Sequence, residues 1–246
     1  MTKLSVNVNK VATLRNTRHS GIPSVVRASK IALDSGAHGI TVHPRPDQRH
    51  IRPDDVRDLA ALLREYPDAE FNIEGNPFEG HYLDLVRENR PHQCTLVPDD
   101  PGAFTSNQGW DVRKHADRLR PIIATLHDLG CRVSLFVDAD PSQIPIAKEI
   151  GADRIELYTE PYALAFDQGE AETKVVPFAE TARAASQHGL GVNAGHDLSR
   201  VNLPFFLQHV SPVLEVSIGH SLIADALEIG YPATVKGFLE AIGGQR

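Results

Sequence analysis

Gly151-Ala152-Asp153-Arg154-Ile155-Glu156-Leu157-Tyr158-Thr159 is the stretch that decides the fold of this chain. A glycine ends a helical pattern, and an apolar strand pattern begins a few residues later. Joints this short between helix and strand are typical of βα units. The same form recurs at Gly36-Ala37-His38-Gly39-Ile40, Gly130-Cys131-Arg132-Val133 and Gly189-Leu190-Gly191-Val192. The chain is therefore predicted to repeat one βα unit.

Eight strand candidates accompany these joints. They are short, nearly continuous and rich in Val, Ile, Leu and Phe, which is typical of parallel strands covered on both faces. Amphipathic helical patterns separate them, and one of these contains Pro121, which predicts a kink or a helix that starts late. The predicted strands are Leu4–Asn9, Gly39–Pro44, Glu70–Gly75, Gln93–Pro98, Arg132–Asp138, Arg154–Thr159, Gly191–Gly195 and Leu214–Gly219.

The number of repeats selects the architecture. Eight units in 246 residues give about 31 residues per unit, the size of one βαβ repeat. We therefore predict an α/β fold, a closed (β/α)8 TIM barrel that forms a single catalytic domain over residues 1–246. A doubly wound open sheet is the alternative. It is disfavoured because Asn7-Val8-Asn9-Lys10 follows the first strand, where a dinucleotide-binding protein would have a GxGxxG turn.

Composition restricts the class of function. The chain has 41% hydrophobic and 23% charged residues, ordinary values for a globular protein, and its net charge of −7 argues against a nucleic-acid-binding surface. No segment resembles a signal peptide or approaches the ~20 apolar residues of a membrane span, so we expect a cytoplasmic protein without a membrane partner. Cys94 and Cys131 lie in apolar runs and are predicted to be buried, reduced thiols.

Polar residues follow the predicted strands at the ends where barrel enzymes carry their active sites. Burying such side chains is costly unless a partner satisfies them. Their convergence on one barrel mouth is better explained by a ligand than by chance. In strand order, the residues are Asn7, Asn9, Lys10, Arg15 and Arg18, then His43, Arg45 and His50, then Glu74, then Glu156 and Thr159, then Asn193 and His196, and finally Ser217 and His220.

Purely structural roles remain open for several of these residues. His43 could be a strand-end histidine that makes a backbone hydrogen bond. Glu156 could be an inward carboxylate paired to an arginine. Asn7 and Asn193 could serve only to brace loops.

Glycines at two strand ends indicate phosphate binding. Gly195-His196-Asp197 and Gly219-His220-Ser221 each fit a strand, a tight turn and the start of a helix. Backbone N–H groups at a helix N-terminus favour an anion, and barrels often bind phosphate after strands seven and eight. The long segment Asp99–Trp110 follows strand four, and it is either a lid that excludes water or a plain surface loop.

Taken in order, these motifs resemble the pyridoxine 5'-phosphate synthase (PdxJ) family along nearly the whole chain. No single motif is decisive, but together they are highly specific. The matching stretches are residues 7–18, 39–45, 49–51, 72–74, 96–98, 133–138, 192–196 and 217–220.

The resemblance implies a (β/α)8 barrel with extra helices that assembles as a homo-octamer. It implies condensation of 1-deoxy-D-xylulose 5-phosphate with 3-amino-2-oxopropyl phosphate to pyridoxine 5'-phosphate, phosphate and water, with no metal or organic cofactor. His43 would be a general base, Glu74 a second acid/base and His196 the proton donor. The residues that match substrate- or phosphate-binding positions are Asn7, Arg18, Arg45, His50, Thr105, Gly219 and His220.

The chain also departs from the family pattern close to the expected pocket. Asn9-Lys10 replaces the commoner Asp-His, and Asp197 replaces a commoner glycine. These three positions still belong to the predicted substrate-binding set. Histidine and glycine are commoner at the positions of Tyr158 and Glu160.

Two other functions compete with this one. A metal-dependent barrel hydrolase or isomerase could take its ligands from the strand-end histidines and Glu74, but no HxH or HExxH spacing occurs. A non-catalytic barrel that binds phosphosugars is the second alternative. The arginines near these histidines favour small phosphorylated substrates over a divalent cation.

Overall fold

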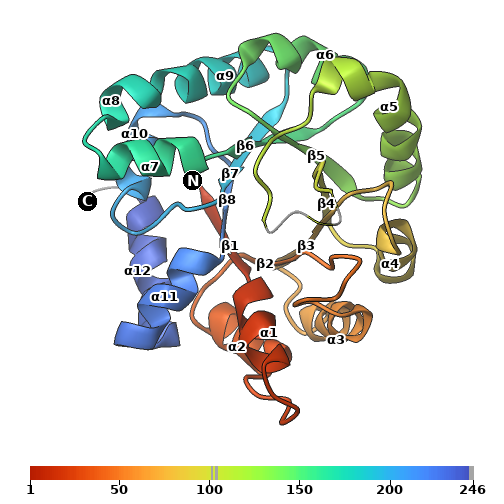
Figure 1. The fold of residues 1–246 in the computed structure, drawn as a ribbon, viewed down its shortest axis with the longest axis vertical. Coiled ribbons are helices and arrows are strands. Elements are labelled where there is room, and N and C mark those ends of the chain that lie inside the picture. The colour runs from red at the N-terminus through yellow and green to blue at the C-terminus, as the bar shows by residue number, and fades with distance from the viewer. Residues whose placement is uncertain (101, 103–104, 244–246) are drawn as a thin grey trace.

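A computed structural model describes residues 1–100, 102 and 105–243 of the chain. Eight parallel strands form a closed barrel in chain order, and the last strand pairs with the first (Figure 1). This confirms the predicted (β/α)8 barrel. The strands are β1 (Lys3–Asn7), β2 (Gly39–Val42), β3 (Glu70–Gly75), β4 (Gln93–Leu96), β5 (Arg132–Val137), β6 (Arg154–Tyr158), β7 (Gly191–Gly195) and β8 (Glu215–Ile218).

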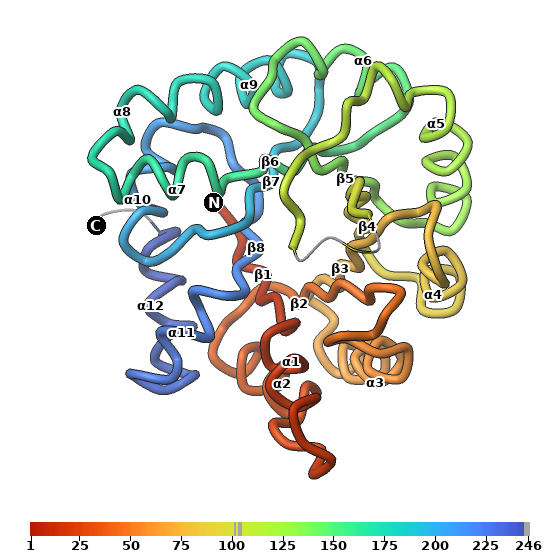
Figure 2. The backbone as a smooth tube through the Cα atoms, viewed as in Figure 1, coloured from red at the N-terminus to blue at the C-terminus, as the bar shows by residue number. Residues whose placement is uncertain are grey.

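The helices surround the barrel (Figure 2). More than one helix follows β1, β6 and β8, which confirms the expected extra helices. The helices are α1 (Asn9–Asn16), α2 (Val25–Asp34), α3 (Pro53–Leu63), α4 (Tyr82–Asn89), α5 (Val112–Asp128), a 3-10 turn (Pro141–Gln143), α6 (Ile144–Glu149), α7 (Glu160–Asp167), α8 (Ala171–Lys174), α9 (Val176–Gln187), α10 (Leu203–His209), α11 (His220–Ile229) and α12 (Tyr231–Gly243).

Several predicted strand ends differ from the structure by one or two residues. Two of the differing boundaries have a clear local reason. The first strand was predicted to reach Asn9, but β1 ends at Asn7, whose side-chain oxygen accepts the Asn9 N–H at 2.9 Å as α1 begins. The late helix start inferred from Pro121 is wrong. Helix α5 begins at Val112, because the Asp111 carboxylate caps its first turn, and it continues through the proline.

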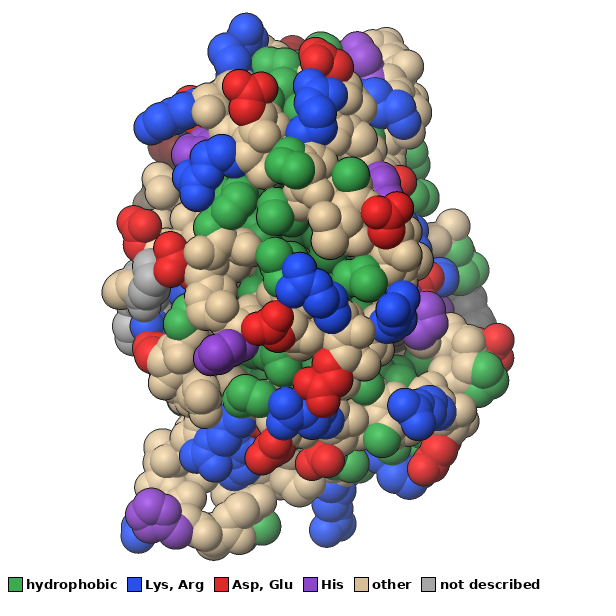
Figure 3. Space-filling model, turned by 90° about the vertical axis from the view of Figure 1, so that its right-hand side faces the viewer, with side chains coloured by type: hydrophobic (Ala, Val, Ile, Leu, Met, Phe, Trp, Pro, Cys, Tyr) green, Lys and Arg blue, Asp and Glu red, His purple; other side chains and the backbone are tan. Residues whose placement is uncertain are grey.

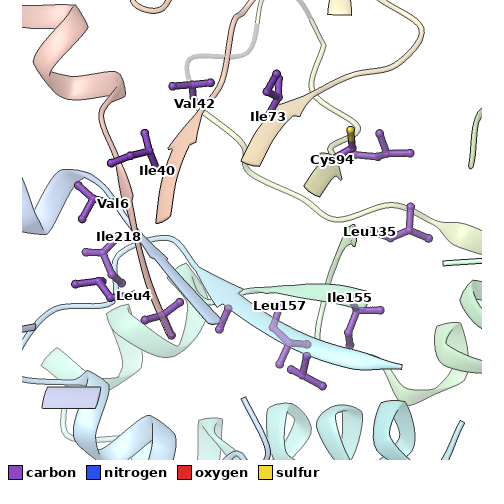
Figure 4. Close-up of a cluster of buried hydrophobic side chains, with 14 of the residues drawn as sticks. Leu4, Val6, Ile40, Val42, Ile73, Cys94, Leu135, Ile155, Leu157 and Ile218 are labelled. Carbon is purple, nitrogen blue, oxygen red and sulfur yellow. The ribbon is translucent and has the colours of Figure 1, made fainter. Parts of the chain in front are cut away.

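The hydrophobic core lies between the outer face of the barrel and the surrounding helices. Figure 4 shows this cluster, with fully buried side chains contributed by neighbouring strands, including Leu4, Ile40, Ile73 and Ile155. Cys94 belongs to the same core, and it and Cys131 are buried free thiols, as predicted. The covering helices thus supply the apolar partners for one face of every strand.

The barrel interior is polar, whereas the sequence predicted apolar residues on both strand faces. Gln93 on β4 donates to Glu215 on β8 at 3.2 Å, across the barrel. Arg154 on β6 lies 3.7 Å from the Glu215 carboxylate and donates to Asn193 on β7 at 3.0 Å. Buried polar groups are tolerated because they satisfy one another in this way. Asn193 is therefore part of the barrel interior rather than a loop brace.

The surface mixes charges of both signs. Figure 3 shows one side of the molecule, on which lysine and arginine side chains alternate with aspartate and glutamate around smaller apolar areas. Among the helices of the described residues, none combines the length and the apolar character that crossing a membrane requires.

Candidate active site

A cavity of about 370 Å³ opens at the C-terminal ends of the strands. It brings together most of the residues that the sequence singled out. The predicted site residues that line it are Asn7, Asn9, Lys10, His43, Arg45, His50, Glu74, Thr105, His196, Asp197, Gly219 and His220. His43, Glu74 and His196, which come from three different strands, thus share one cavity.

Of the residues predicted to be catalytic or to bind substrate, Arg18 lies outside this cavity lining. It is exposed in the segment between α1 and α2, which projects away from the barrel (Figure 2). Arg15 also lies outside the cavity lining, and its guanidinium forms an ion pair with Asp55 on α3. Sequence patterns could not distinguish these arginines from one that faces the pocket.

His43 and Glu74 form the centre of the cavity. The His43 Nδ1 atom lies 4.0 Å from the Glu74 carboxylate, and Asn7 donates its side-chain N–H to that carboxylate at 3.4 Å. The Asn9 side chain accepts the His43 backbone N–H at 2.9 Å. Asn7 and Asn9 therefore connect the end of β1 to the ends of β2 and β3. Asn7 both accepts the Asn9 backbone N–H and contacts the Glu74 carboxylate.

Burial and nearby cations control the protonation of the histidines at this centre. Desolvation, followed by the positive charge of Arg45, moves the pKa of His43 well below its usual value. The same causes, with Lys10 and Arg49, lower the pKa of His50 to about 4. Both imidazoles are therefore neutral at pH 7, and a neutral imidazole can accept a proton.

The pKa values of the Glu74 and Glu156 carboxyl groups in the cavity are raised, whereas those of the histidines are lowered. Burial raises the pKa of Glu74 well above its usual value, and the nearby Glu156 carboxylate raises it further. Burial and the charge of Glu215 raise the pKa of Glu156 to about 8. The interpretation of Glu156 as an arginine-paired carboxylate is wrong, because Arg154 pairs with Glu215 and Glu156 accepts a hydrogen bond from Thr95 at 3.4 Å. Both cavity carboxyls can therefore hold a proton near neutral pH.

Arg45, predicted to contact substrate, is held by an acidic partner from the segment after β4. Its guanidinium lies 2.5 Å from the Asp99 carboxylate, which also accepts a 2.6 Å hydrogen bond from Ser106. Part of the predicted lid, residues 101, 103 and 104, lies outside the described residues. At the far end of this segment, the Trp110 indole donates to the Leu96 carbonyl at 3.0 Å.

His196 follows β7 at the opposite side of the cavity. Its backbone and that of Asp197 have positive φ angles, 75° and 57°. The Thr159 hydroxyl donates to the His196 carbonyl at 2.7 Å, and Asn202 donates to the Asp197 carbonyl at 3.1 Å. Desolvation lowers the pKa of His196. The negative charges of Asp197 and Asp99 oppose this change, whereas the positive charge of Arg45 adds to it.

The start of α11 lines another part of the cavity. Gly219 precedes the helix, and a methyl group at this position would lie only 3.3 Å from the Asn7 side chain. A larger residue at this position would require the Asn7 side chain to shift by a few tenths of an ångström. His220 begins the helix with an exposed side chain at the cavity rim. Together with Lys10 at the start of α1, this part of the cavity offers helix N–H groups and a cation to an anion.

The structure adds cavity residues that the sequence did not place in the site. Arg49, Ser106, Glu160 and Ser221 also line the cavity. The departure of position 160 from the family pattern was the available signal for Glu160. Among the described residues, no group of three or more His, Cys, Asp or Glu side chains is arranged to hold a metal ion.

Comparison with known families identifies the chain. Residues 4–244 match the family model described as "Pyridoxal phosphate biosynthesis protein PdxJ". The chain belongs to the PdxJ family. Curated relatives from several bacteria bear the name "Pyridoxine 5'-phosphate synthase". The one from Albidiferax ferrireducens is 61% identical over 98% of this chain and 97% of its own length. The relative from Xanthomonas campestris is 54% identical over 99% of this chain and 97% of its own length. The relative from Bacteroides thetaiotaomicron is 54% identical over 96% of this chain and 97% of its own length.

Solved structures show the same fold at low sequence identity. A 3-hexulose-6-phosphate synthase superposes with a TM-score of 0.65 at 10% identity, covering 98% of this chain and 99% of the other. The phosphoribosyl anthranilate isomerase from Thermotoga maritima superposes with a TM-score of 0.61 at 15% identity, covering 100% of both chains. These likenesses support the barrel fold of this PdxJ family member.

Three of the five positions at which the sequence departs from the expected family pattern lie together in space. Asp197 and Glu160 both line the cavity, and the charge of Asp197 contributes to raising the pKa of Glu160, after burial. The Tyr158 hydroxyl donates to the Glu160 carboxylate, and the Tyr158 ring contacts the imidazole of His196. Three departures in the sequence thus form one contact group around a predicted catalytic histidine.

Proposed function

We propose that this chain is a pyridoxine 5'-phosphate synthase. It would condense 1-deoxy-D-xylulose 5-phosphate with 3-amino-2-oxopropyl phosphate, a ring-closing reaction of the transferase class, to give pyridoxine 5'-phosphate, phosphate and water. The observation that carries the proposal is the convergence of His43, Glu74 and His196 in one cavity that also contains Arg45 and Lys10. The enzyme names of the curated relatives support a catalytic rather than a purely binding role.

The electrostatics of the cavity suit repeated proton transfer. His43 is neutral at pH 7 and can accept a proton from an amine or a carbon acid, and Glu74, 4.0 Å away, can pass on or return a proton because its pKa is raised. His196 would deliver a proton at the other side. Its lowered pKa by itself opposes this role. Bound phosphate groups bring negative charge that favours the imidazolium form.

Two ends of the cavity could hold the two phosphate groups. At one end, Gly219 and the first turn of α11 meet Lys10 at the start of α1. At the other, Arg45 and Arg49 line the wall beside His50. A substrate phosphate would compete with Asp99 for Arg45, and guanidinium groups bind phosphate with paired donors. We propose that Thr105, at the cavity rim, contacts substrate from the segment after β4.

Assembly into a homo-octamer is part of the proposal. Large apolar side chains are exposed on and near α1 and α11, which contact each other, and they include Leu227 at 80%, Ile22 at 68% and Leu14 at 51% exposure. Apolar surface of this kind favours burial against another protein surface. Light scattering should give a mass near eight times 26.9 kDa, and a monomeric mass would contradict the octamer.

The decisive experiment supplies both phosphorylated substrates to the purified protein. We expect the absorbance of pyridoxine phosphate to rise together with free phosphate, and a chelator to leave the rate unchanged. Binding of either substrate without product would favour the non-catalytic alternative. Loss of activity on chelation, restored by a divalent cation, would favour the metal-dependent alternative.

A further inference from the structure

Three aromatic rings meet at the end of the barrel beside the cavity. The His196 imidazole lies 5.0 Å from the Phe136 ring on β5 and 5.7 Å from the Tyr158 ring on β6, measured between ring centroids. Phe136 and Tyr158 are themselves 5.5 Å apart. Tyr158 stands nearly perpendicular to the imidazole, at 81°. Both aromatic residues are buried, and together with Val97 they form a small apolar cluster separate from the main core.

The polar end of Tyr158 is fixed as well as its ring. Its hydroxyl donates to the carboxylate of Glu160, the first residue of α7. Thr159, between them, donates its hydroxyl to the carbonyls of both Gly195 and His196. The turn from β6 into α7 therefore makes two contacts with His196. Thr159 contacts the His196 main chain, and Tyr158 contacts the imidazole ring.

The orientation of the His196 ring depends on these ring contacts. Among the described residues, none forms a hydrogen bond to either nitrogen of the His196 imidazole. The pKa of the imidazole is set by burial and by nearby charges. Aspartates 197 and 99, Arg45 and Lys10 act on the imidazole through their charge alone. A ring without a hydrogen-bonded partner is held in one orientation by its packing.

We propose that Tyr158 is a positioning residue for the proton donor His196, and that Glu160 holds Tyr158 in place by accepting its hydroxyl hydrogen bond. The inference rests on the proposed function, in which His196 delivers a proton. A Tyr158 ring that loses its tether can turn about its side-chain bonds, and the imidazole can then leave the orientation that the reaction needs. Small displacements of a catalytic group lower turnover more than they lower substrate binding.

The tether is tested by separating its hydroxyl from its ring. Tyr158→Phe keeps an aromatic ring at this position but removes the hydroxyl donor, and we expect turnover to fall about tenfold while both KM values stay within about twofold. Glu160→Ala removes the acceptor and should give the same loss. The double variant should be no slower than either single variant, because both changes break one bond.

Glu160→Gln distinguishes a tether from a charge effect. Its amide oxygen still accepts the tyrosine hydroxyl, so it should recover at least half of the turnover lost in Glu160→Ala. If Glu160→Gln is as slow as Glu160→Ala, the charge of Glu160 matters rather than the bond, and the inference fails. Unchanged turnover in Tyr158→Phe would also overturn it.

Tyr66 provides the matched control. Its hydroxyl donates to the Asp34 carboxylate at 2.6 Å, far from the cavity lining. Tyr66→Phe removes the same type of bond and should leave both turnover and KM unchanged. A tenfold loss in this variant as well would attribute the effect to general stability and would remove the special role of Tyr158.

A readout without turnover separates this inference from the proposed function. Histidine ring signals in NMR spectra report the nuclear Overhauser contacts between His196 and residue 158. These contacts should weaken in Tyr158→Phe and Glu160→Ala but persist in Glu160→Gln. If the wild-type protein forms no product while this pattern holds, the proposed function fails and the tether stands. If product forms and the contacts are the same in all variants, the tether fails alone.

Discussion

Burial and neighbouring cations keep the His43 imidazole neutral, which is the form that accepts a proton. Glu74, 4.0 Å away, has the opposite shift, because burial raises the pKa of its carboxyl group and favours the protonated form. We expect His43→Ala and Glu74→Ala each to lower turnover by at least ~100-fold, the usual contribution of a positioned acid or base. The measurement is a steady-state assay with both substrates.

The control for these variants is His81→Ala. His81 is an exposed histidine at the start of α4, away from the cavity, and its removal should not change turnover. Circular dichroism should show that all the variants are folded. Near-wild-type turnover in a folded His43→Ala or Glu74→Ala protein would remove that residue's catalytic role.

Asp197 is the neighbour that most strongly offsets the effect of burial on the pKa of His196. Replacing it with Asn removes the negative charge, so the pKa of His196 should fall further. Because a donor must be protonated, the decline of turnover at high pH should move to lower pH, with an about threefold to tenfold loss at pH 8. Asn tolerates the positive φ of this position, 57°, so backbone strain does not confuse the result.

A pH profile of turnover for the wild type and Asp197→Asn measures this shift. Asp225→Asn is a comparison at another carboxylate, which pairs with Arg200 and does not line the cavity. Superimposable profiles for wild type and Asp197→Asn would show that the Asp197 charge does not act on the donor.

Helices α1 and α3 are joined by one nearly buried ion pair. The Arg15 guanidinium contacts both carboxylate oxygens of Asp55, and the same carboxylate accepts the Arg52 N–H at 2.8 Å and caps α3. Arg15 also donates to the His50 carbonyl at 3.1 Å, so the pair holds a cavity residue indirectly. The sequence placed Arg15 at a strand end, but its partner is on another helix.

Asp55→Ala should therefore destabilise the protein. It removes the cap and leaves the Arg15 charge buried without its partner, and we expect the free energy of unfolding to fall by about 3 kcal/mol. Asp55→Asn keeps an acceptor for the cap and should lose less. Urea denaturation measures both. A change below about 0.5 kcal/mol in Asp55→Ala would show that the pair does not stabilise the fold.

The polar interior makes the stability of the whole barrel depend on pH. In the folded protein the pKa of Glu156 is raised to about 8 from 4.5. Between these values the folded state keeps a proton that the unfolded state has released, so the free energy of unfolding falls as pH rises. The contribution of this group is fully present below pH 4.5 and is lost as pH passes 8.

Glu156→Gln has no proton to release. Relative to the wild type, its free energy of unfolding should therefore rise between pH 5 and pH 9, by a few kcal/mol at most, when measured by denaturation at several pH values. Glu172→Gln, at an exposed carboxylate on α8, is the control and should follow the wild-type curve. Parallel curves for Glu156→Gln and the wild type would mean that Glu156 does not titrate differently on folding.

Local sequence was sufficient for the barrel and for most of the site. The alternation of short apolar strands and amphipathic helices, and the glycine at four helix-to-strand joints, can be recognised from residues a few positions apart. Eight such repeats leave little choice of architecture. Strand-end positions then place His43, Glu74 and His196 at one mouth, because parallel strands all end on the same side. These features follow from the chain direction and need no knowledge of distant contacts.

Tertiary structure decided which partner each polar side chain found. Gln93 and Glu215 are 122 residues apart and meet only because the barrel closes. For the same reason the sequence did not reveal that Arg154 pairs with Glu215 rather than with Glu156, or that Arg18 lies outside the cavity lining. A charge or hydrogen-bonding group has several candidate partners of equal chemistry along the chain. The distance between them in the folded state selects one, because electrostatic and hydrogen-bond energies fall steeply with separation.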